Sequence, residues 1–262
     1  MQIEINIPAP CEKALEILER HGYEAYLVGG CVRDSILGRE PGDWDICTNA
    51  LPEEMIAAFA DYRLVLNGLK HGTVTVIIMH TAIEITTYRI DGEYEDNRHP
   101  KEVTFTSDLA LDLSRRDFTI NALAYNQGKG VVDCFGGLED LANGVIKAVG
   151  DPYKRFHEDG LRILRAVRFA CVLGFTYDER TKDAVRDCNY LLRNIATERI
   201  QVELNKILLS PNVRQGLEDM YQLGLYSYFL PEMCHTYGFA QHNPFNCYDV
   251  FGHIVRSVEL IE

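Results

Sequence analysis

Residues 27–34, LVGGCVRD, together with residues 43–45, DWD, decide the fold of this chain. Residues 25–28, which include the apolar start of the first stretch, predict a short buried strand that runs into a glycine pair, and residues 32–37 return to a helical pattern. The second stretch predicts a short strand over 43–47. A strand, a glycine turn and a helix beside a further strand indicate a small unit that mixes strands and helices.

The flanking sequence extends this unit into a small mixed sheet with helices. Apolar periodicity predicts helices over 10–21 and 52–60, and β-branched and aromatic residues predict strands over 63–66, 73–79 and 83–88. The pattern continues with a polar loop over 91–100, a strand near 103–105 and a helix over 115–125.

The later part of the chain is predicted to be helical. Glycine and proline residues cluster between 136 and 152 and predict a domain boundary. Beyond it, the periodicity predicts helices over 154–173, 179–188, 197–209 and 211–222 and from about 248. The chain is therefore predicted to be α+β, with the mixed sheet first and a helical region after it.

Length and composition describe a globular chain and exclude a disordered or fibrous one. The 262 residues are 47% hydrophobic and 25% charged. No apolar run approaches the ~20 residues needed to span a bilayer, and the N-terminus lacks a signal-peptide pattern. The eight cysteines are scattered singly, which argues against a disulfide scaffold or a zinc ribbon. We therefore expect a cytoplasmic protein with no membrane partner.

The charge of the chain is negative but unevenly distributed. A formal net charge of −13 at first argues against a nucleic-acid partner, because phosphate contacts require a basic field. Residues 151–206, however, hold 11 basic and 9 acidic side chains. Any basic groove is therefore expected to draw on the middle of the chain.

Two short patterns predict phosphate chemistry. Asp43 and Asp45, at i and i+2 on a strand, would project both carboxylates from one face, and Mg²⁺ prefers a few carboxylates plus phosphate oxygens. Gly29 and Gly30 would let backbone N–H groups approach phosphate oxygens, and Arg33 can add a fork of donors. Each pattern alone also fits surface acids or a plain turn, whereas together they favour nucleotidyl or phosphoryl transfer.

Residues 158–169, EDGLRILRAVRF, bring an acid and several arginines together. On one helix Asp159, Arg162 and Arg165 would fall within a sector of ~120°, and Arg168 would continue a slow spiral around it. These side chains can therefore face one ligand. A helix braced by ion pairs would carry the same residue types.

These segments resemble one known family. GGCVRD followed by DWD is similar to the head of the class II branch of the polymerase-β nucleotidyltransferases, the family of bacterial tRNA CCA-adding enzymes and poly(A) polymerases. Residues 115–123, RRDFTINAL, resemble the family's RRDFTxNA motif. The resemblance implies a third catalytic acid at Glu84, triphosphate binding by Arg116, and a role for Asp117 in orienting an arginine or contacting the ribose.

The same resemblance implies that residues 158–169 read the base of the incoming nucleotide. Cytosine and adenine both offer an exocyclic amine next to a ring-nitrogen acceptor, which an aspartate acceptor beside an arginine donor satisfies. Guanine and uracil present a carbonyl and an N–H there, which leaves both protein groups mismatched. We therefore expect Asp159 and Arg162 to select the base, with support from Arg165 and Arg168.

The resemblance also implies a division of the chain and an activity. It implies a catalytic head over 1–140, a helical neck for base recognition over 141–210 and the start of a helical body over 211–262. The implied activity is template-independent addition of CCA to the tRNA 3′ end from CTP and ATP, with Mg²⁺ held by Asp43 and Asp45. The partner is then the acceptor stem of tRNA, and no obligate protein partner is inferred.

Further segments refine this interpretation and leave alternatives open. Residues 91–100 resemble the flexible loop that CCA-adding enzymes keep and CC-adding relatives shorten. Residues 241–253 resemble the approach to an HD-type phosphohydrolase domain, with His253 as a candidate ligand, so we expect a longer protein. Residues 196–204 resemble the family's last motif and are expected to brace the neck. The alternatives are a poly(A) polymerase or A-adding enzyme, and a nucleotide-binding head that serves a C-terminal phosphohydrolase.

Overall fold

The computed structural model describes residues 3–92, 103–241 and 247–261. Within them the chain forms two compact units, and the division along the sequence falls between Ala142 and Asn143. Most of the predicted loop over 91–100 and part of the segment 241–253 lie outside the described residues. Among the described residues, no helix has both the length and the apolar character that a membrane span requires.

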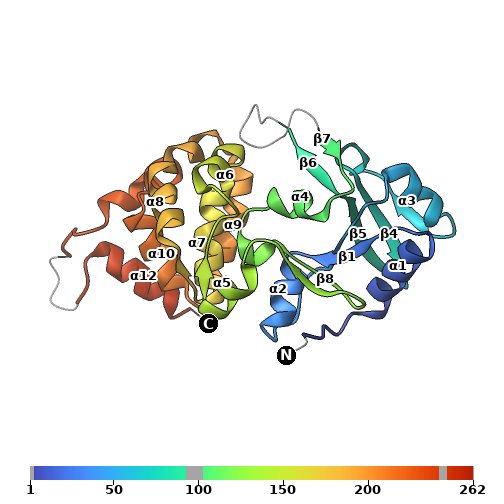
Figure 1. Cartoon of the computed structure of the whole chain (residues 1–262). Helices are drawn as coiled ribbons and strands as arrows, with labels where there is room; N and C mark the ends of the chain where they lie inside the picture. Colours follow the sequence, from blue (N-terminus) through green and yellow to red (C-terminus); the bar gives the residue numbers. More distant parts are fainter. Residues whose placement is uncertain (1–2, 93–102, 242–246, 262) are drawn as a thin grey trace. The chain divides into compact units, whose positions relative to one another are not determined.

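A seven-stranded mixed sheet forms the centre of the first unit (Figure 1). In spatial order its strands are β3 (Arg63–Val65), β4 (Thr73–Ile78), β5 (Thr81–Thr87), β2 (Asp45–Thr48), β1 (Ala25–Val28), β8 (Leu123–Asn126) and β9 (Gly130–Asp133). Strands β2 and β5 pair in parallel, and the other neighbours in this sheet pair antiparallel. Strands β6 (Arg89–Asp91) and β7 (Val103–Phe105) form a separate antiparallel pair.

Short helices accompany this sheet. They are α1 (Ala9–Arg20), α2 (Gly30–Ile36), α3 (Pro52–Ala58), α4 (Leu109–Ser114), α5 (Gly137–Asn143) and the 3₁₀ turns η1 (Leu69–His71) and η2 (Thr119–Asn121). Helix α1 packs against β1, β2, β4 and β5 with the buried side chains of Leu15 and Leu18. The predicted strand over 25–28 and the predicted helices over 10–21 and 52–60 are confirmed, the helices to within two residues.

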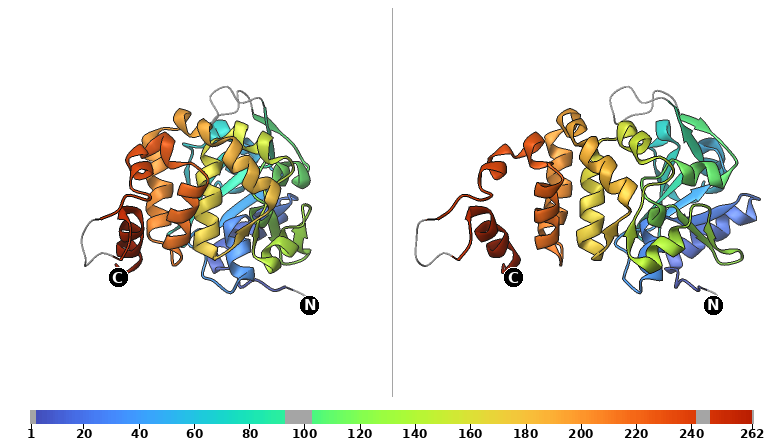
Figure 2. Two further views of the ribbon diagram at one scale, coloured as in Figure 1. Left: turned by 90° about the vertical axis from the view of Figure 1, so that its left-hand side faces the viewer. Right: turned by 60° about the vertical axis from the view of Figure 1, so that its left-hand side comes forward.

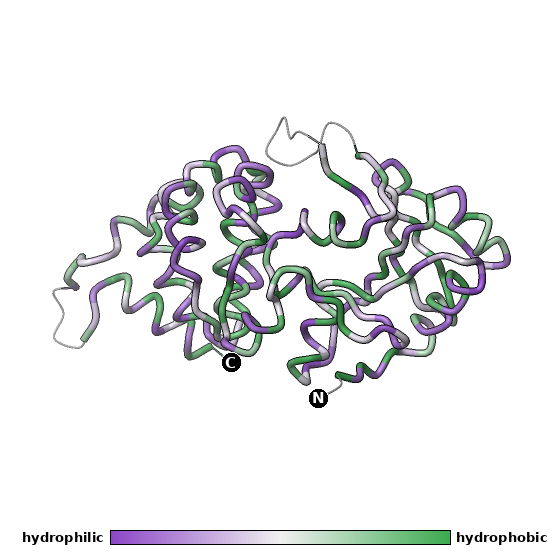
Figure 3. The backbone as a smooth tube through the Cα atoms, viewed as in Figure 1, coloured by the Kyte–Doolittle hydropathy of each residue, from purple (hydrophilic) through white to green (hydrophobic). Residues whose placement is uncertain are grey.

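Alternation along β4 and β5 gives the sheet one buried and one open face. Val74, Val76, Ile83 and Ile85 are fully or almost fully buried, whereas the side chain of Glu84 between the two isoleucines is exposed. Hydrophobic and hydrophilic residues are accordingly interleaved along these strands (Figure 3). Because successive side chains of a strand point to opposite faces, the core on one face leaves polar groups free to gather on the other.

The second unit is predominantly helical. It contains α6 (Pro152–Glu158), α7 (Leu161–Leu173), α8 (Glu179–Asp187), η3 (Asn189–Asn194), α9 (Thr197–Leu208), α10 (Val213–Gln222), α11 (Tyr226–Phe229), η4 (Pro231–His235) and α12 (Val250–Glu259). Helix α7 is the buried centre of this unit and packs against α6, α9 and α10. Helices α9 and α10 lie beside it (Figure 2). The short strands β10 (Val145–Ile146) and β11 (Thr176–Tyr177) pair in parallel, so the predicted all-helical region contains this one exception among its described residues. The predicted α+β class is confirmed.

The predicted helix over 115–125 is wrong. The segment instead forms the turn η2 and then β8, which pairs with β1 on one side and β9 on the other. Leu123, Ala124 and Tyr125 are all buried, so they form an apolar run without alternation. Periodicity cannot separate such a buried strand from a helix, and the choice is made by the neighbouring strands.

The predicted single helix over 154–173 is also wrong in one respect. Helix α6 ends at Glu158 and α7 begins at Leu161, because Asp159 adopts an extended conformation with φ −144° and ψ 105°. Gly160 stands directly after it, and a Cβ atom there would lie 3.1 Å from the Cβ of Leu191. Asp159 therefore lies at a break between two helices and not on the face of one.

The start of α5, at Gly137, packs tightly in the first unit, and a substitution there can test this packing. A Cβ atom at this position would lie 2.2 Å from the backbone oxygen of Thr119. We expect Gly137→Ala to lower the free energy of unfolding by about 2–3 kcal/mol, because backbone must move to admit the methyl group. Urea unfolding measures the change. Gly42→Ala, whose Cβ would meet nothing within 4 Å, is the control, and equal stability of both variants would contradict this packing.

Candidate functional site

The parallel pairing of β2 with β5 brings two predicted acids together. Asp45, the first residue of β2, is directly paired with Glu84 of β5, so their side chains leave the sheet on the same face. The following pair, Ile46 and Ile85, is buried on the other face. Asp43 is exposed and precedes β2 by two residues, so the predicted strand over 43–47 begins later than expected.

The charges of these acids act on one another. Burial raises the pKa of Asp45 to about 6, the charges of Asp43 and Glu84 add to that rise, and the charge of Arg116 opposes it. A carboxylate whose pKa is raised by like charges gains from any cation that binds between them. This part of the open face is therefore a region of concentrated negative charge.

The acids have the chemistry of a divalent-cation site without forming a closed one. Among the described residues, no three His, Cys, Asp or Glu side chains converge closely enough to enclose a metal ion. Carboxylates are nevertheless the ligands that Mg²⁺ prefers, and Mg²⁺ is usually bound by one or two of them together with water and substrate phosphates. Asp43, Asp45 and Glu84 therefore fit a cation that is completed by a bound phosphate chain.

A glycine turn and an arginine lie close together in the same unit. Gly29 precedes α2 with φ +81°, and its N–H donates to the backbone oxygen of Leu123 at 3.0 Å. A Cβ atom at Gly29 would lie only 2.9 Å from Nη1 of Arg116. The positive φ favours glycine at this position, and the short approach shows that the Arg116 guanidinium lies next to the turn.

Arg33 is held by other protein groups. Its guanidinium donates to both carboxylate oxygens of Asp34, at 2.8 and 2.9 Å, and to Oδ1 of Asn121 at 2.5 Å. The Nδ2 of Asn121 in turn donates to Asp117, which also accepts from the N–H of Phe118. Arg33 and Asp117 thus belong to one buried network that fixes α2 against η2, and a phosphate that bound Arg33 would meet a guanidinium already engaged.

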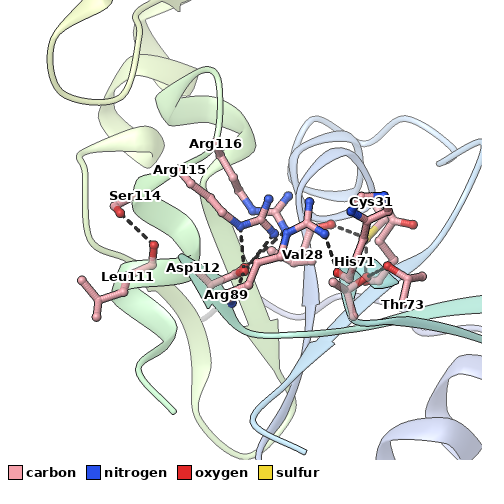
Figure 4. A network of polar contacts seen from close by, with 12 residues as sticks. Val28, Cys31, His71, Thr73, Arg89, Leu111, Asp112, Ser114, Arg115 and Arg116 are labelled. Atoms are coloured by element: carbon pink, nitrogen blue, oxygen red, sulfur yellow. Dashed lines mark hydrogen bonds and ion pairs between the residues drawn. The ribbon is translucent and has the colours of Figure 1, made fainter. Parts of the chain in front are cut away.

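A buried acid, Asp112, holds the two arginines that follow α4 (Figure 4). Its Oδ1 accepts from Nε and Nη2 of Arg115, at 3.0 and 2.8 Å, and from the backbone N–H of Arg89 at 3.1 Å. Its Oδ2 lies 3.7 Å from Nη2 of Arg116. Sequence reasoning missed Asp112, although its spacing of three and four residues from the arginine pair is the spacing of side chains that meet on a helix.

The buried thiols near this site are not nucleophiles. Burial raises the pKa of Cys31 to about 11, and its Sγ lies 3.4 Å from the backbone oxygen of Val28, to which it donates. Burial raises the pKa of Cys47 further, and the charge of Asp112 adds to that rise. Both thiols therefore stay protonated at neutral pH and serve as packing groups.

The second predicted set, in the helical unit, is bound in ion pairs. Asp159 accepts from Nη1 and Nη2 of Arg199, at 3.2 and 2.8 Å, so the two side chains form a bidentate pair. Arg162 donates to Glu158 at 2.6 Å and to the backbone oxygen of Arg155 at 3.0 Å. Sequence reasoning expected Arg199 only to brace the helices and gave Glu158 no role.

The two supporting arginines of this set lie against an aromatic ring. The guanidinium groups of Arg165 and Arg168 lie 5.3 and 4.0 Å from the ring centroid of Phe169. Arg168 also forms a 2.6 Å ion pair with the buried Glu203. The predicted common sector for Asp159, Arg162 and Arg165 is wrong, because Asp159 precedes α7, although Asp159 and Arg162 remain adjacent at the start of that helix.

A mixed sheet with acids on its open face, a glycine turn against an arginine, and a following helical unit are features of the polymerase-β-like nucleotidyltransferases. Residues 25–147 match the family described as the poly(A) polymerase head domain, and residues 174–236 match the probable RNA and SrmB-binding site of polymerase A. The chain belongs to the class II branch of these proteins, the family of CCA-adding enzymes and poly(A) polymerases. The polymerase-β-like nucleotidyltransferases generally use a divalent metal.

Individual relatives agree with this assignment. The chain is 49% identical over 219 residues to the CCA-adding enzyme of Anoxybacillus flavithermus, a match that covers 84% of this chain and 54% of the relative. The chain is also 50% identical over 231 residues to the CCA-adding enzyme of Levilactobacillus brevis, a match that covers 87% of this chain and 57% of the relative. The chain therefore spans about half the length of the curated relatives it matches.

Solved structures show the same fold. The crystal structure of the Bacillus stearothermophilus CCA-adding enzyme in complex with CTP matches with a TM-score of 0.78 and 40% identity, over 85% of this chain and 54% of that one. The structure of the Thermotoga maritima CCA-adding enzyme complexed with tRNA matches with a TM-score of 0.72 and 27% identity. This match covers 92% of this chain and 55% of the Thermotoga maritima chain.

The raised pKa of Asp45 predicts that its charge destabilises the metal-free fold. The folded-state pKa of about 6 lies above the ordinary value of 3.8, so the contribution of the neutral carboxyl to stability is lost as pH rises through 6. We expect Asp45→Asn to raise the free energy of unfolding by about 1–2 kcal/mol at about pH 7.5, after allowance for partial exposure.

Urea unfolding in EDTA at several pH values measures this effect. The advantage of the asparagine variant should shrink as pH falls towards about 4, where both side chains are neutral. Glu53→Gln, in the first turn of α3 and away from the acids, serves as the control. An advantage of Asp45→Asn that does not change with pH would show that the charge of Asp45 is not its cause.

Proposed function

We propose that this chain is the nucleotidyltransferase part of an enzyme that adds CCA to the 3′ end of tRNA from CTP and ATP without a nucleic-acid template. The single observation that carries the proposal is the placement of Asp45 beside Glu84 on the open face of a sheet whose neighbouring glycine turn contacts Arg116. The curated relatives from Anoxybacillus flavithermus and Levilactobacillus brevis, both named CCA-adding enzymes, support the choice of substrate class.

The proposed reaction is attack of the tRNA 3′ hydroxyl on the α-phosphate of the nucleotide, with release of pyrophosphate. Mg²⁺, which we propose is held by Asp43 and Asp45 with Glu84 nearby, supplies charge neutralisation for the hydroxyl and the leaving oxygen when bound. Gly30 offers its backbone N–H to the triphosphate, and Gly29, whose own N–H donates to Leu123, forms the turn that lets the nucleotide approach this backbone.

Arginines supply the remaining positive charge of the proposed site. Arg116 has Nη and Nε donors that the described residues do not fill, since its one polar contact among them is the 3.7 Å pair with Asp112. We assign it the triphosphate, which a guanidinium binds bidentately. Arg33 and Asp117 hold the turn through Asn121, and a rearrangement of that network would let either one reach the nucleotide.

The base is read, in this proposal, by Asp159 and Arg162. The bidentate pair with Arg199 fixes the orientation of the Asp159 carboxylate, and Glu158 does the same for Arg162. An oriented acceptor beside an oriented donor recognises the amine and ring nitrogen that cytosine and adenine share. Arg165 and Arg168, which lie against Phe169, support this pair.

We further propose the head over 1–140, the neck over 141–210 and the beginning of the body over 211–262 as the working parts of this enzyme. The eight cysteines, all unpaired, support a cytoplasmic location. The acceptor stem of tRNA is the proposed macromolecular partner.

The test is extension of a tRNA that ends at its discriminator base, in Mg²⁺, with CTP, ATP or both, read at single-nucleotide resolution. We expect two added nucleotides with CTP alone and three with both, and no extension by the Asp43→Ala variant, because it lacks a metal ligand. Long A tails would identify a poly(A) polymerase, and addition of A without C would identify an A-adding enzyme. No extension by the full-length protein would contradict the proposal.

Base selection has its own test in Asp159→Ala. We expect the preference of the enzyme for CTP over UTP in kcat/KM to fall by about 100-fold, because the amine then has no buried acceptor to distinguish it from a carbonyl. Single-nucleotide addition with each triphosphate measures this ratio. Asp178→Ala removes an acid of the same unit that only caps α8 and should leave the ratio unchanged, as would Asp159→Ala if this role were wrong.

A further inference from the structure

Asp112 is a buried acid to which neither the sequence motifs nor the proposed reaction gives a role. It lies on α4 with no exposed surface. A buried carboxylate is costly unless cations and hydrogen bonds compensate it. Three donors converge on its Oδ1, two from Arg115 and one from the backbone N–H of Arg89. This oxygen is fully occupied.

The second carboxylate oxygen faces a different arginine. Oδ2 of Asp112 accepts no hydrogen bond within the described residues, and its partner there is Nη2 of Arg116 at 3.7 Å. That separation is an ion pair but too long for a hydrogen bond. The hydrogen bonds from Arg115 therefore compensate the buried carboxylate of Asp112. Arg116 is attracted by the charge of Asp112 but forms no hydrogen bond with it, so the N–H donors of Arg116 remain available to a ligand.

Arg116 is confined between this acid and the glycine turn. One end of its guanidinium, Nη2, faces Asp112, and the other, Nη1, lies 2.9 Å from the Cβ position of Gly29. A free arginine side chain has several rotatable bonds and loses much conformational entropy when it is ordered by a ligand. A guanidinium that is oriented beforehand avoids most of that loss.

The contrast with Arg33 shows why the long contact matters. Arg33 is fixed by three short hydrogen bonds to Asp34 and Asn121, which occupy its Nε and both Nη atoms. Arg116 is oriented by charge alone, and its Nε makes no hydrogen bond within the described part of the chain. Of the two, Arg116 alone combines a set direction with available donors.

We propose that Asp112 is a positioning residue that orients Arg116 toward the triphosphate of the bound nucleotide, a role that rests on the proposed function. Arg115 holds the Asp112 carboxylate in place through two hydrogen bonds, and the N–H of Arg89 ties the same carboxylate to the start of β6. In this arrangement Arg116 is presented to the triphosphate, while Arg115 neutralises the buried Asp112.

The experiment compares CTP affinity and turnover in Asp112→Asn and the wild-type chain. Asparagine retains an oxygen that can accept from Arg89 and Arg115 but removes the charge that attracts Arg116. We expect CTP to bind about tenfold more weakly, as is typical when an outer partner of a ligand-binding group is removed, with KM rising more than kcat falls. Asp133→Asn is the matched control, since Asp133 accepts three backbone N–H groups and forms no ion pair with an arginine among the described residues.

A double-mutant cycle separates positioning from general stability. In an Arg116→Ala background, Asp112→Asn should cause no further loss of CTP affinity, because the residue through which it acts is gone. A purely structural role would lower the unfolding midpoint and add its full effect on affinity to that of Arg116→Ala. Additivity in this cycle overturns the inference, as does unchanged CTP affinity in Asp112→Asn.

A second variant serves if Asp112→Asn does not fold. Arg115→Gln removes the charged partner of Asp112 and leaves only the N–H of Arg89 on Oδ1. The carboxylate can then bind Arg116 closely and withdraw it from the triphosphate, so we expect CTP affinity to fall several-fold. Wild-type affinity in a folded Arg115→Gln overturns the inference. If the wild-type chain binds CTP and extends tRNA and these variants do the same, only the role of Asp112 is refuted. If the full-length wild-type protein neither binds CTP nor extends tRNA, the proposed function is refuted as well.

Discussion

The first unit depends on the parallel pairing of β2 with β5. This pairing sets Asp45 beside Glu84 on the open face while Ile46 and Ile85 enter the core on the other. A slip of either strand by one residue would bury its acid and expose its isoleucine. The hydrophobic effect therefore holds two like charges together, although their repulsion contributes to the raised pKa of Asp45. A cation bound there would relieve this repulsion, which is why we propose a metal at these acids.

The arginines of this chain differ in how fully its own acids and amides engage them. In the first unit Arg33 and Arg115 donate short hydrogen bonds to Asp34, Asn121 and Asp112, whereas Arg116 is only attracted by Asp112. In the helical unit the bidentate pair of Asp159 and Arg199 stabilises the break between α6 and α7. Protein ion pairs thus build the framework, and the charged groups that they engage least are those to which we assign the substrate.

Several features of the fold were predictable from local pattern. The strand over 25–28, the helix α1 and the exposure of Glu84 between buried isoleucines all follow from periodicity. Strand β8 was missed, because Leu123, Ala124 and Tyr125 are buried on both faces and carry no alternation. The break at Asp159 was missed because the segments on both sides of it are helical. The roles of Asp112 and Arg199 required knowledge of contacts that local spacing does not provide.

By itself the sequence determined the α+β class, the membership of a nucleotidyltransferase family and the residue types available for phosphate and base. Short-range preferences and ordered motifs are enough for that, since each acts within a few residues. Only the tertiary structure decided which charges meet. The pairing of Asp45 with Glu84 joins residues far apart along the chain. Such contacts arise from sheet register and core packing, which are properties of the whole unit and not of any segment.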